Sequence, residues 1–252
     1  MPKDREIEAT DSVGLGGSVA PGGSVKVSSR HYEAGLHLWS ARHYARLCTE
    51  LESKRQSEAP LIDIQHRAYA TSAVLSSAVF LESLVNEVFQ DAADATAGQV
   101  SLRIGPLGER AIALMGEFWN ASEQGGRHIG VLDKFQMALL FAEKQKLDRG
   151  ANPYQDAKLL VDIRNKLVHF RPAWRTPSEE TQLEQVLKTK FPENALLAGS
   201  GNSWFPHKCL GAGCAQWSWR TARALADEWT ERLGITRFYG EARDLANEWP
   251  TP

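Results

Sequence analysis

The longest uninterrupted segment of this chain lies between Pro60 and Gly98, where neither glycine nor proline occurs. These two residue types are the strongest breakers of helices, so their absence over such a length favours one long helix. Its first half is crowded with small residues that let another helix approach closely: Ala70, Ser72, Ala73, Ser76, Ser77 and Ala78. Its second half carries bulky apolar residues: Val79, Phe80, Leu84, Val85, Val88 and Phe89. The sequence therefore predicts a long helix that forms the spine of a hydrophobic core.

Size and charge narrow the class of protein. With 252 residues, of which 42% are hydrophobic, the chain can bury a sizeable core. Lysine and arginine together number 29 against 31 aspartates and glutamates, so the formal net charge is -2. A protein that coats nucleic acid needs a broad basic surface, so any contact with RNA or DNA is expected to be local.

The sequence indicates neither secretion nor insertion into a membrane. Its beginning, MPKDREIEATD, lacks the apolar run of a secretory signal. The longest apolar run, from Ala73 to Leu81, stops at Glu82, well short of the roughly 20 residues that a membrane span requires. Only three cysteines occur, Cys48, Cys209 and Cys214, which is too few for a disulfide framework and favours a reducing compartment. We therefore expect a soluble, cytoplasmic protein that contacts no membrane.

Helical spacing recurs along most of the chain. The segment from His31 to Pro60 repeats apolar residues at helical intervals: Leu36, Trp39, Leu47 and Leu51. Similar patterns predict helices over residues 107–119, 131–146, 154–170 and 214–233, with short helices ending near Lys188 and spanning 239–248. Strict alternation long enough to predict a sheet is not found. The predicted fold class is all-α, an up-and-down helical bundle.

The first 30 residues differ in composition from the rest of the chain. They contain no aromatic residue and repeat the motif GGSV at Gly16 and Gly22. Such a segment buries too little apolar surface to offset the entropy lost on ordering. We therefore predict a flexible leader over residues 1–30.

The helix predicted from Tyr154 onward combines an apolar stripe with a polar face. The stripe consists of Leu159, Leu160, Ile163, Leu167 and Phe170, and Pro172 ends the helix near Phe170. Asp162, Asn165 and His169 are three and four residues apart and fall on the opposite side, with Arg164 on its flank. Histidine titrates near neutral pH, which suits a general acid or base.

The pattern Arg164-Asn165-x-x-x-His169 resembles the Arg-x4-6-His motif of HEPN domains, an all-helical family named for higher eukaryotes and prokaryotes nucleotide-binding. The helix that contains Ser76, Glu82 and Asn86 is similar to the first long core helix of these domains. The resemblance covers residues 31–175 and implies a HEPN-like bundle there, with residues 176–252 as a helical extension packed on it.

The resemblance further implies a metal-independent endoribonuclease without a cofactor, of the kind found in bacterial defence, toxin–antitoxin and RNA-processing systems. Many family members form homodimers in which two copies of the motif meet in one cleft. His169 would then be the base on the ribose 2′-hydroxyl or the acid to the leaving oxygen, and Arg164 would hold the phosphate. Asn165 would orient phosphate or water, while Glu82, Asn86 and Asp162 would line the cleft. The expected partners are tRNA or mRNA, a second copy of the chain, and an antitoxin or other regulator.

A second function, from another class, stays open. Some HEPN domains cut nothing, and the same surface would serve a non-catalytic module for dimerisation or for binding a nucleotide or a protein. The near-neutral charge favours this module, whereas the RNxxxH motif favours the enzyme. Arg164 and His169 in one solvent-open cleft would support the enzyme; either residue buried in an ion pair would support the module.

Two smaller groups of residues have both a functional and a structural interpretation. His207, Cys209 and Cys214 lie close in sequence, but a fourth zinc ligand is absent nearby, so two buried cysteines flanking a glycine turn are the favoured reading. Among the tryptophans, Trp217 is expected in the core by its spacing from Leu225. Trp174 and Trp204 are expected to be exposed.

Overall fold

In the computed structural model, residues 16–19, 25–28, 30–96, 98, 101–122, 128–172, 174 and 179–239 are described. The chain divides into two compact units, residues 1–32 and residues 33–252. The first unit contains two strands, β1 (Gly16–Val19) and β2 (Val25–Ser28), which pair antiparallel with Gly16 opposite Ser28. The prediction of a flexible leader did not include this ladder. Valines that favour strands flank a proline- and glycine-containing connection, a pattern typical of a hairpin but too short to predict one.

Within its described residues, the second unit consists of helices joined by turns and loops and contains no strand, which confirms the all-α prediction. Its α-helices and shorter helical segments, in chain order, are α1 (Ala34–Arg55), η1 (Gln56–Glu58), α2 (Ile64–Thr96), α3 (Glu109–Ala121), α4 (Val131–Phe141), α5 (Tyr154–Val168), α6 (Gln182–Leu187), η2 (Ala195–Leu197), η3 (Trp204–Lys208) and α7 (Ala212–Leu233). The helix predicted over residues 239–248 lies almost entirely outside the described residues.

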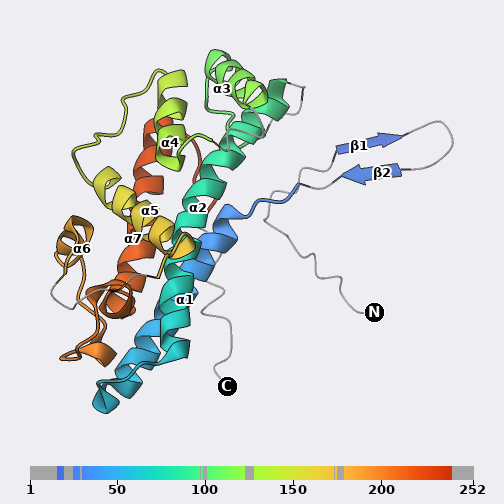
Figure 1. The fold of residues 1–252 in the computed structure, drawn as a ribbon. Coiled ribbons are helices and arrows are strands. Elements are labelled where there is room, and N and C mark those ends of the chain that lie inside the picture. Colours follow the sequence, from blue (N-terminus) through green and yellow to red (C-terminus); the bar gives the residue numbers. More distant parts are fainter. Residues whose placement is uncertain are drawn as a thin grey trace, which may run out of the picture. The chain divides into compact units, whose positions relative to one another are not determined.

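The long helix α2 is the spine of the core, as predicted. It packs against α1, α3 and α7, and it also contacts α4 and α5 (Figure 1). Its bulky half is buried through Phe80, Leu81, Leu84 and Val85. Its small residues Ala70, Ala73 and Ser77 are also fully buried, so the neighbouring helices approach its backbone closely.

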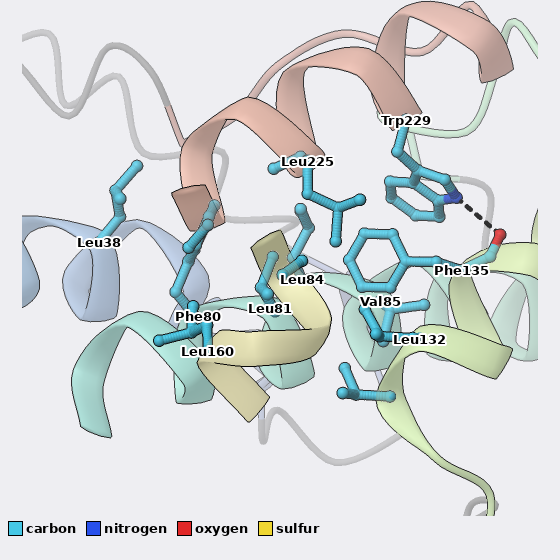
Figure 2. Close-up of a cluster of buried hydrophobic side chains, with 14 of the residues drawn as sticks. Leu38, Phe80, Leu81, Leu84, Val85, Leu132, Phe135, Leu160, Leu225 and Trp229 are labelled. Carbon is cyan, nitrogen blue, oxygen red and sulfur yellow. Dashed lines mark hydrogen bonds between the residues drawn. The ribbon is translucent and has the colours of Figure 1, made fainter. Parts of the chain in front are cut away.

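The last helix, α7, belongs to the same core as the helices that precede it. Figure 2 shows Leu225 and Trp229 of α7 pointing toward the α2 side chains and toward Phe135 of α4. The indole Nε1 of Trp229 donates a hydrogen bond to the carbonyl oxygen of Phe135 at 3.0 Å. The C-terminal extension therefore supplies a central part of the core of residues 33–252.

Two apolar residues that the sequence placed on buried stripes are exposed, and these placements were wrong. Leu36 of α1 faces solvent because α1 instead buries a stripe of mostly small residues: Ala34, Leu38, Ala41, Ala45 and Cys48. Small residues suit a helix that packs closely on the alanine- and serine-rich half of α2. Phe170 is 51% exposed because α5 ends at Val168, before Phe170 could pack as part of the helix.

By length and composition alone, α2 is the one helix of the described residues that could cross a membrane. Half of its most apolar stretch is buried inside the protein. The core helix of a soluble protein passes the same test, so this observation is weak support for a membrane span.

Candidate functional site

A buried lysine connects two of the residues that the sequence singled out. The Nζ atom of Lys134 on α4 donates hydrogen bonds to Glu82 Oε1 at 3.0 Å and to Asn86 Oδ1 at 2.8 Å, both on α2. Glu82 and Asn86 are four residues apart and therefore project from one side of the helix, as predicted. The side chain of Lys134 is only 1% exposed. Its ammonium group also lies 5.7 Å from the centre of the Trp119 ring, within reach of a cation–π interaction.

Arg164 of α5 faces the same carboxylate. Its guanidinium NH2 lies 3.6 Å from Glu82 Oε2, so Glu82 stands between two cations, Lys134 and Arg164. The side chains of Arg164 and Glu82 are 28% and 36% exposed. This pair is therefore partly open to solvent, and Arg164 is neither free nor fully enclosed in an ion pair.

The other predicted residues of α5 lie nearer to solvent. Asn165 and His169 are exposed, and Asp162 is half-buried. His169 is the residue at which α5 ends, and its backbone N–H donates to the carbonyl oxygen of Asn165 at 2.9 Å. Within the described part of the chain, the side chains of Asp162, Asn165 and His169 form no hydrogen bond or ion pair.

The structure thus brings Glu82 and Asn86 of α2 into one polar cluster with Arg164 of α5. Asn165 and His169 remain exposed at the C-terminal end of α5. In chemical terms, the cluster fixes a guanidinium that keeps part of its surface in contact with solvent. The exposed imidazole can exchange a proton with an incoming ligand, and the exposed amide can donate and accept hydrogen bonds. The predicted auxiliary residue Asp162 makes no contact with this cluster among the hydrogen bonds and ion pairs of the described residues.

Sequence reasoning missed Lys134, which joins α4 to the cluster. The signal was present in VLDKFQMALLF, where Lys134 is adjacent to Phe135 and three residues after Val131. Both apolar residues are buried, so a lysine at this position lies on the buried face of α4. Lysine is seldom buried without a partner, and such a placement predicts an acidic or amide group on the facing helix.

The segment that contains His207, Cys209 and Cys214 has the structural role that the sequence favours, with both cysteines buried. Cys209 and Cys214 are both buried free thiols. Gly213 lies so close to Pro192 that an added Cβ would come within 2.6 Å of the Pro192 carbonyl oxygen. His207 lies instead beside Arg67, with Nδ1 3.5 Å from its NH1 atom, and its pKa is lowered by burial and by that arginine.

Predictions for the tryptophans had mixed outcomes. Trp174 is fully exposed, as predicted. Trp204 was predicted to be exposed, which is wrong, because its ring is buried against Phe191, with the two ring centres 6.1 Å apart. Trp217 packs against the core with partial burial, and Phe191 is again its neighbour.

Comparisons with known proteins add no family to these observations. A scan against protein-family models, a search of curated proteins and a search of solved structures each found no match. The HEPN resemblance of the RNKLVH segment therefore stays a prediction from the sequence.

Proposed function

We propose that this protein is a metal-independent endoribonuclease that uses Arg164, Asn165 and His169. The proposal rests on the ion pair that anchors Arg164 and on the solvent exposure of Asn165 and His169. Arg164 is anchored beside Glu82 while part of its surface stays open, and Asn165 and His169 are exposed and make no side-chain bonds within the described residues. A cation anchored on α5 and an uncommitted imidazole at the end of the same helix suit phosphate chemistry.

The chemistry follows from the roles of the two ionisable groups. An imidazole takes the proton from a ribose 2′-hydroxyl, and the 2′-oxygen attacks the adjacent phosphorus. The bond from phosphorus to the 5′-oxygen breaks, and that oxygen takes a proton from a second imidazole or from water. The products are a 2′,3′-cyclic phosphate and a 5′-hydroxyl. Arg164 offsets the negative charge that grows on the phosphate oxygens, for which its fork of donors is well suited.

A second imidazole is available if two copies of the chain meet at the C-terminal end of α5. A homodimer would place both motifs in one cleft, as the family resemblance implies. The reaction requires a 2′-hydroxyl, so RNA would be cut and DNA would not.

The test is cleavage of labelled total RNA and of tRNA in the presence of EDTA. The wild-type chain is compared with Arg164→Ala and His169→Ala. Two matched controls remove similar groups elsewhere: Lys158→Ala, an exposed cation on α5, and His128→Ala, an exposed histidine outside it. We expect the wild type and both controls to leave 2′,3′-cyclic phosphate ends. Loss of activity in only the two motif variants, with folding and oligomeric state unchanged, supports the proposal.

Cleavage that survives in His169→Ala would overturn the assignment of the imidazole. Cleavage that disappears when EDTA is added would overturn the metal-independent mechanism. If a folded wild-type chain cuts neither substrate, in the presence or absence of EDTA, the ribonuclease proposal fails for these substrates.

A non-catalytic binding module is the second candidate, and one observation favours it. Three apolar side chains are exposed at and beyond the end of α5, beside the motif: Val168, Phe170 and Trp174. An exposed apolar group of this kind is common where a protein binds a partner or a second copy of itself. The module predicts that Phe170→Ala weakens dimerisation or partner binding while RNA is never cut. Sedimentation of the wild type and this variant, run beside the cleavage assay, separates the two candidates.

A further inference from the structure

Away from the α5 motif, helices α1 and α7 pack against each other in opposite directions. Near the end of α1, the Glu52 carboxylate accepts the backbone N–H of Ala212, the first residue of α7, at 2.8 Å. The chain enters α7 through closely packed backbone, because an added Cβ on Gly211 would come within 2.7 Å of the Asn194 Cα and 3.0 Å of Glu52 Oε2. The end of α1 is therefore fixed against the start of α7.

Further along this pair of helices, a series of contacts orients the indole of Trp219 on α7. Gln216 joins the two helices, since its Nε2 donates to Thr49 Oγ1 on α1 at 3.1 Å and its Oε1 accepts the indole N–H of Trp219 at 2.9 Å. The guanidinium carbons of Arg42 on α1 and Arg220 on α7 each lie 5.5 Å from the centre of the Trp219 ring. One ring is thus held in place with two planar cations beside it.

A second aromatic group lies on the same side of α1 as Arg42. The rings of Trp39 and His43 stack with their centres 4.8 Å apart and their planes 10° apart, and Arg46 NH2 lies 3.3 Å from His43 Nδ1. Burial, followed by the charge of Arg46, lowers the pKa of His43, so its ring is uncharged at neutral pH. Trp39, Arg42, His43 and Arg46 follow one another at intervals of three, one and three residues, which places them on one face of the helix. Aromatic rings and arginines therefore alternate along this face.

The two helix faces together form a surface with a local excess of positive charge. We call it the α1–α7 face, and each of its six residues is at least partly exposed: Trp39, Arg42, His43, Arg46, Trp219 and Arg220. Arg220 pairs with no carboxylate among the described residues. Arg46 pairs with Glu50, but both side chains are more than half exposed, and such a pair contributes little, so a phosphate can replace the carboxylate. The chain as a whole carries a formal net charge of -2, so this excess is confined to one place.

We propose that the α1–α7 face binds single-stranded nucleic acid. Unpaired bases stack on aromatic rings and on guanidinium planes, while the phosphates pair with the charges of the arginines. From Trp39 to Arg46, α1 rises by about 10 Å, which matches about three stacked nucleotides. An acidic peptide or an anionic membrane would pair with the arginines but would have no use for the alternating rings. The inference goes beyond the cleavage proposed for α5, because binding at this face requires neither Arg164 nor His169.

The first test is a fluorescence anisotropy titration of the full chain at low salt with short labelled oligonucleotides. Three probes of one sequence are compared: 2′-O-methyl RNA, single-stranded DNA, and the DNA duplex. The 2′-O-methyl probe has no free 2′-hydroxyl, so its binding is measured whether or not the chain cuts RNA. We expect the two single strands to bind alike and the duplex to bind about tenfold more weakly, because its base faces are covered.

Two results of this titration would overturn the proposal. If the duplex bound as tightly as the single strands, the face would attract charge alone and the rings would have no part in binding. If neither single strand bound, while vesicles of anionic phospholipid did, the face would be a surface for lipid headgroups.

Variants assign the binding to the face. Trp39→Ala should weaken binding of both single strands by about tenfold, whereas Trp39→Phe keeps an aromatic ring and should retain most of the affinity. Arg220→Ala should also weaken binding, and Arg220→Lys should restore only the part that depends on charge. Arg110→Ala is the matched control, because Arg110 is an exposed arginine on α3, and it should leave the affinity within about twofold. Unchanged affinity in folded Trp39→Ala and Arg220→Ala would overturn the proposal.

A last measurement needs no variant and so does not depend on how Trp39→Ala folds. The wild-type chain is crosslinked to the 2′-O-methyl probe by ultraviolet light, digested and examined by mass spectrometry. We expect crosslinks at Trp39, His43 or Trp219. Crosslinks confined to α5 would overturn the α1–α7 face as a binding surface and would leave the proposed ribonuclease intact.

Discussion

The ammonium group of Lys134 lies 3.0 Å from the carboxylate of Glu82 inside the helical core. This contact connects α4 to α2, and because Glu82 also faces Arg164 on α5, one carboxylate links three helices. Glu82 therefore contacts both a buried lysine of the core and the arginine of the α5 motif, so a change at Lys134 or Glu82 should affect stability and the position of Arg164.

Replacing Lys134 with methionine should destabilise the protein by about 2 kcal/mol. Methionine fills a similar volume, but Glu82 and Asn86 lose their shared donor, and removal of one partner of a buried ion pair is destabilising. The loss should stay below the roughly 3 to 5 kcal/mol of a fully buried pair, because Glu82 is 36% exposed and still faces Arg164. Lys134→Ala leaves a cavity beside Trp119 and should cost about 2 kcal/mol or more. Urea denaturation measures both free energies of unfolding.

Lys158 supplies the control for these variants, because it is an exposed lysine on α5. Its replacement by methionine or alanine should change the free energy of unfolding by no more than about 0.5 kcal/mol. A loss of less than about 0.5 kcal/mol in Lys134→Met would show that the desolvation cost of the ammonium group cancels its hydrogen bonds, contrary to this prediction.

Replacing Glu82 with glutamine should reduce RNA cleavage without unfolding the protein, if the proposed ribonuclease is correct. The amide keeps an acceptor for Lys134 but no longer attracts Arg164, so the guanidinium loses its anchor. We expect a loss of about tenfold in kcat/KM, smaller than the loss in Arg164→Ala.

The double variant Glu82→Gln/Arg164→Ala provides the control for this interpretation. If Glu82 acts through Arg164, the double variant should be no slower than Arg164→Ala alone. If the double variant instead lost kcat/KM by the product of the two single-variant losses, Glu82 would act independently of Arg164.

Sequence reasoning found the elements whose signals are local. The absence of glycine and proline between Pro60 and Gly98 predicted α2, and the stripe through Leu160 and Ile163 predicted α5. The pairing of Glu82 and Asn86 on one side of α2 also followed from their spacing. Each of these inferences requires only the geometry of a single helix.

What the sequence did not predict depends on contacts between distant segments. The partners of Lys134, Glu82 and Asn86, cannot be identified until the packing of α4 against α2 is given. Leu36 points to solvent because α1 packs through alanines, a choice made by the small residues of the facing helix. Cys48, Glu52 and His66 come together through the pairing of α1 with α2, whereas the sequence grouped Cys209 and Cys214 with His207.

Stability should fall in acid partly through Asp63 at the start of α2. Its Oδ1 accepts the backbone N–H of His66 at 2.9 Å, and Arg55 pairs with its Oδ2. The hydrogen bond from His66 lowers the pKa of Asp63 most, burial opposes this, and the bond from Arg55 lowers the pKa further. Because the pKa is lower in the folded state than its ordinary value of 3.8, the stabilisation is complete well above pH 3.8 and is lost as the pH falls through the folded-state pKa.

Comparison with Asp63→Asn isolates this charge. Asparagine can still accept the helix N–H, so the variant keeps the cap and loses only the carboxylate. We expect the wild type to be more stable by about 1 kcal/mol at neutral pH, and the difference to shrink as the pH falls through the lowered pKa of Asp63. Urea denaturation across this range measures it. A difference that stays constant with pH would mean that the charge of Asp63 does not contribute.

Gly213 should not tolerate alanine, although alanine is the better helix former. In an exposed helix, replacing glycine by alanine stabilises by about 1 kcal/mol. Here the added Cβ would lie 2.6 Å from the carbonyl oxygen and 2.9 Å from the ring of Pro192, so backbone would have to move. Overpacking of this kind costs about 1 to 3 kcal/mol, so we expect Gly213→Ala to lower the melting temperature.

The matched control for Gly213→Ala is Gly201→Ala, at an exposed glycine with open space around its Cβ position. Its melting temperature should stay the same or rise, because the substitution only restricts the unfolded chain. If Gly213→Ala proved as stable as this control, the segment at Pro192 would have to move away from α7 at little cost. In that case the close packing around Asn194 and Gly211, which positions the Glu52 carboxylate, would be adaptable, and Gly211→Ala would be tolerated as well.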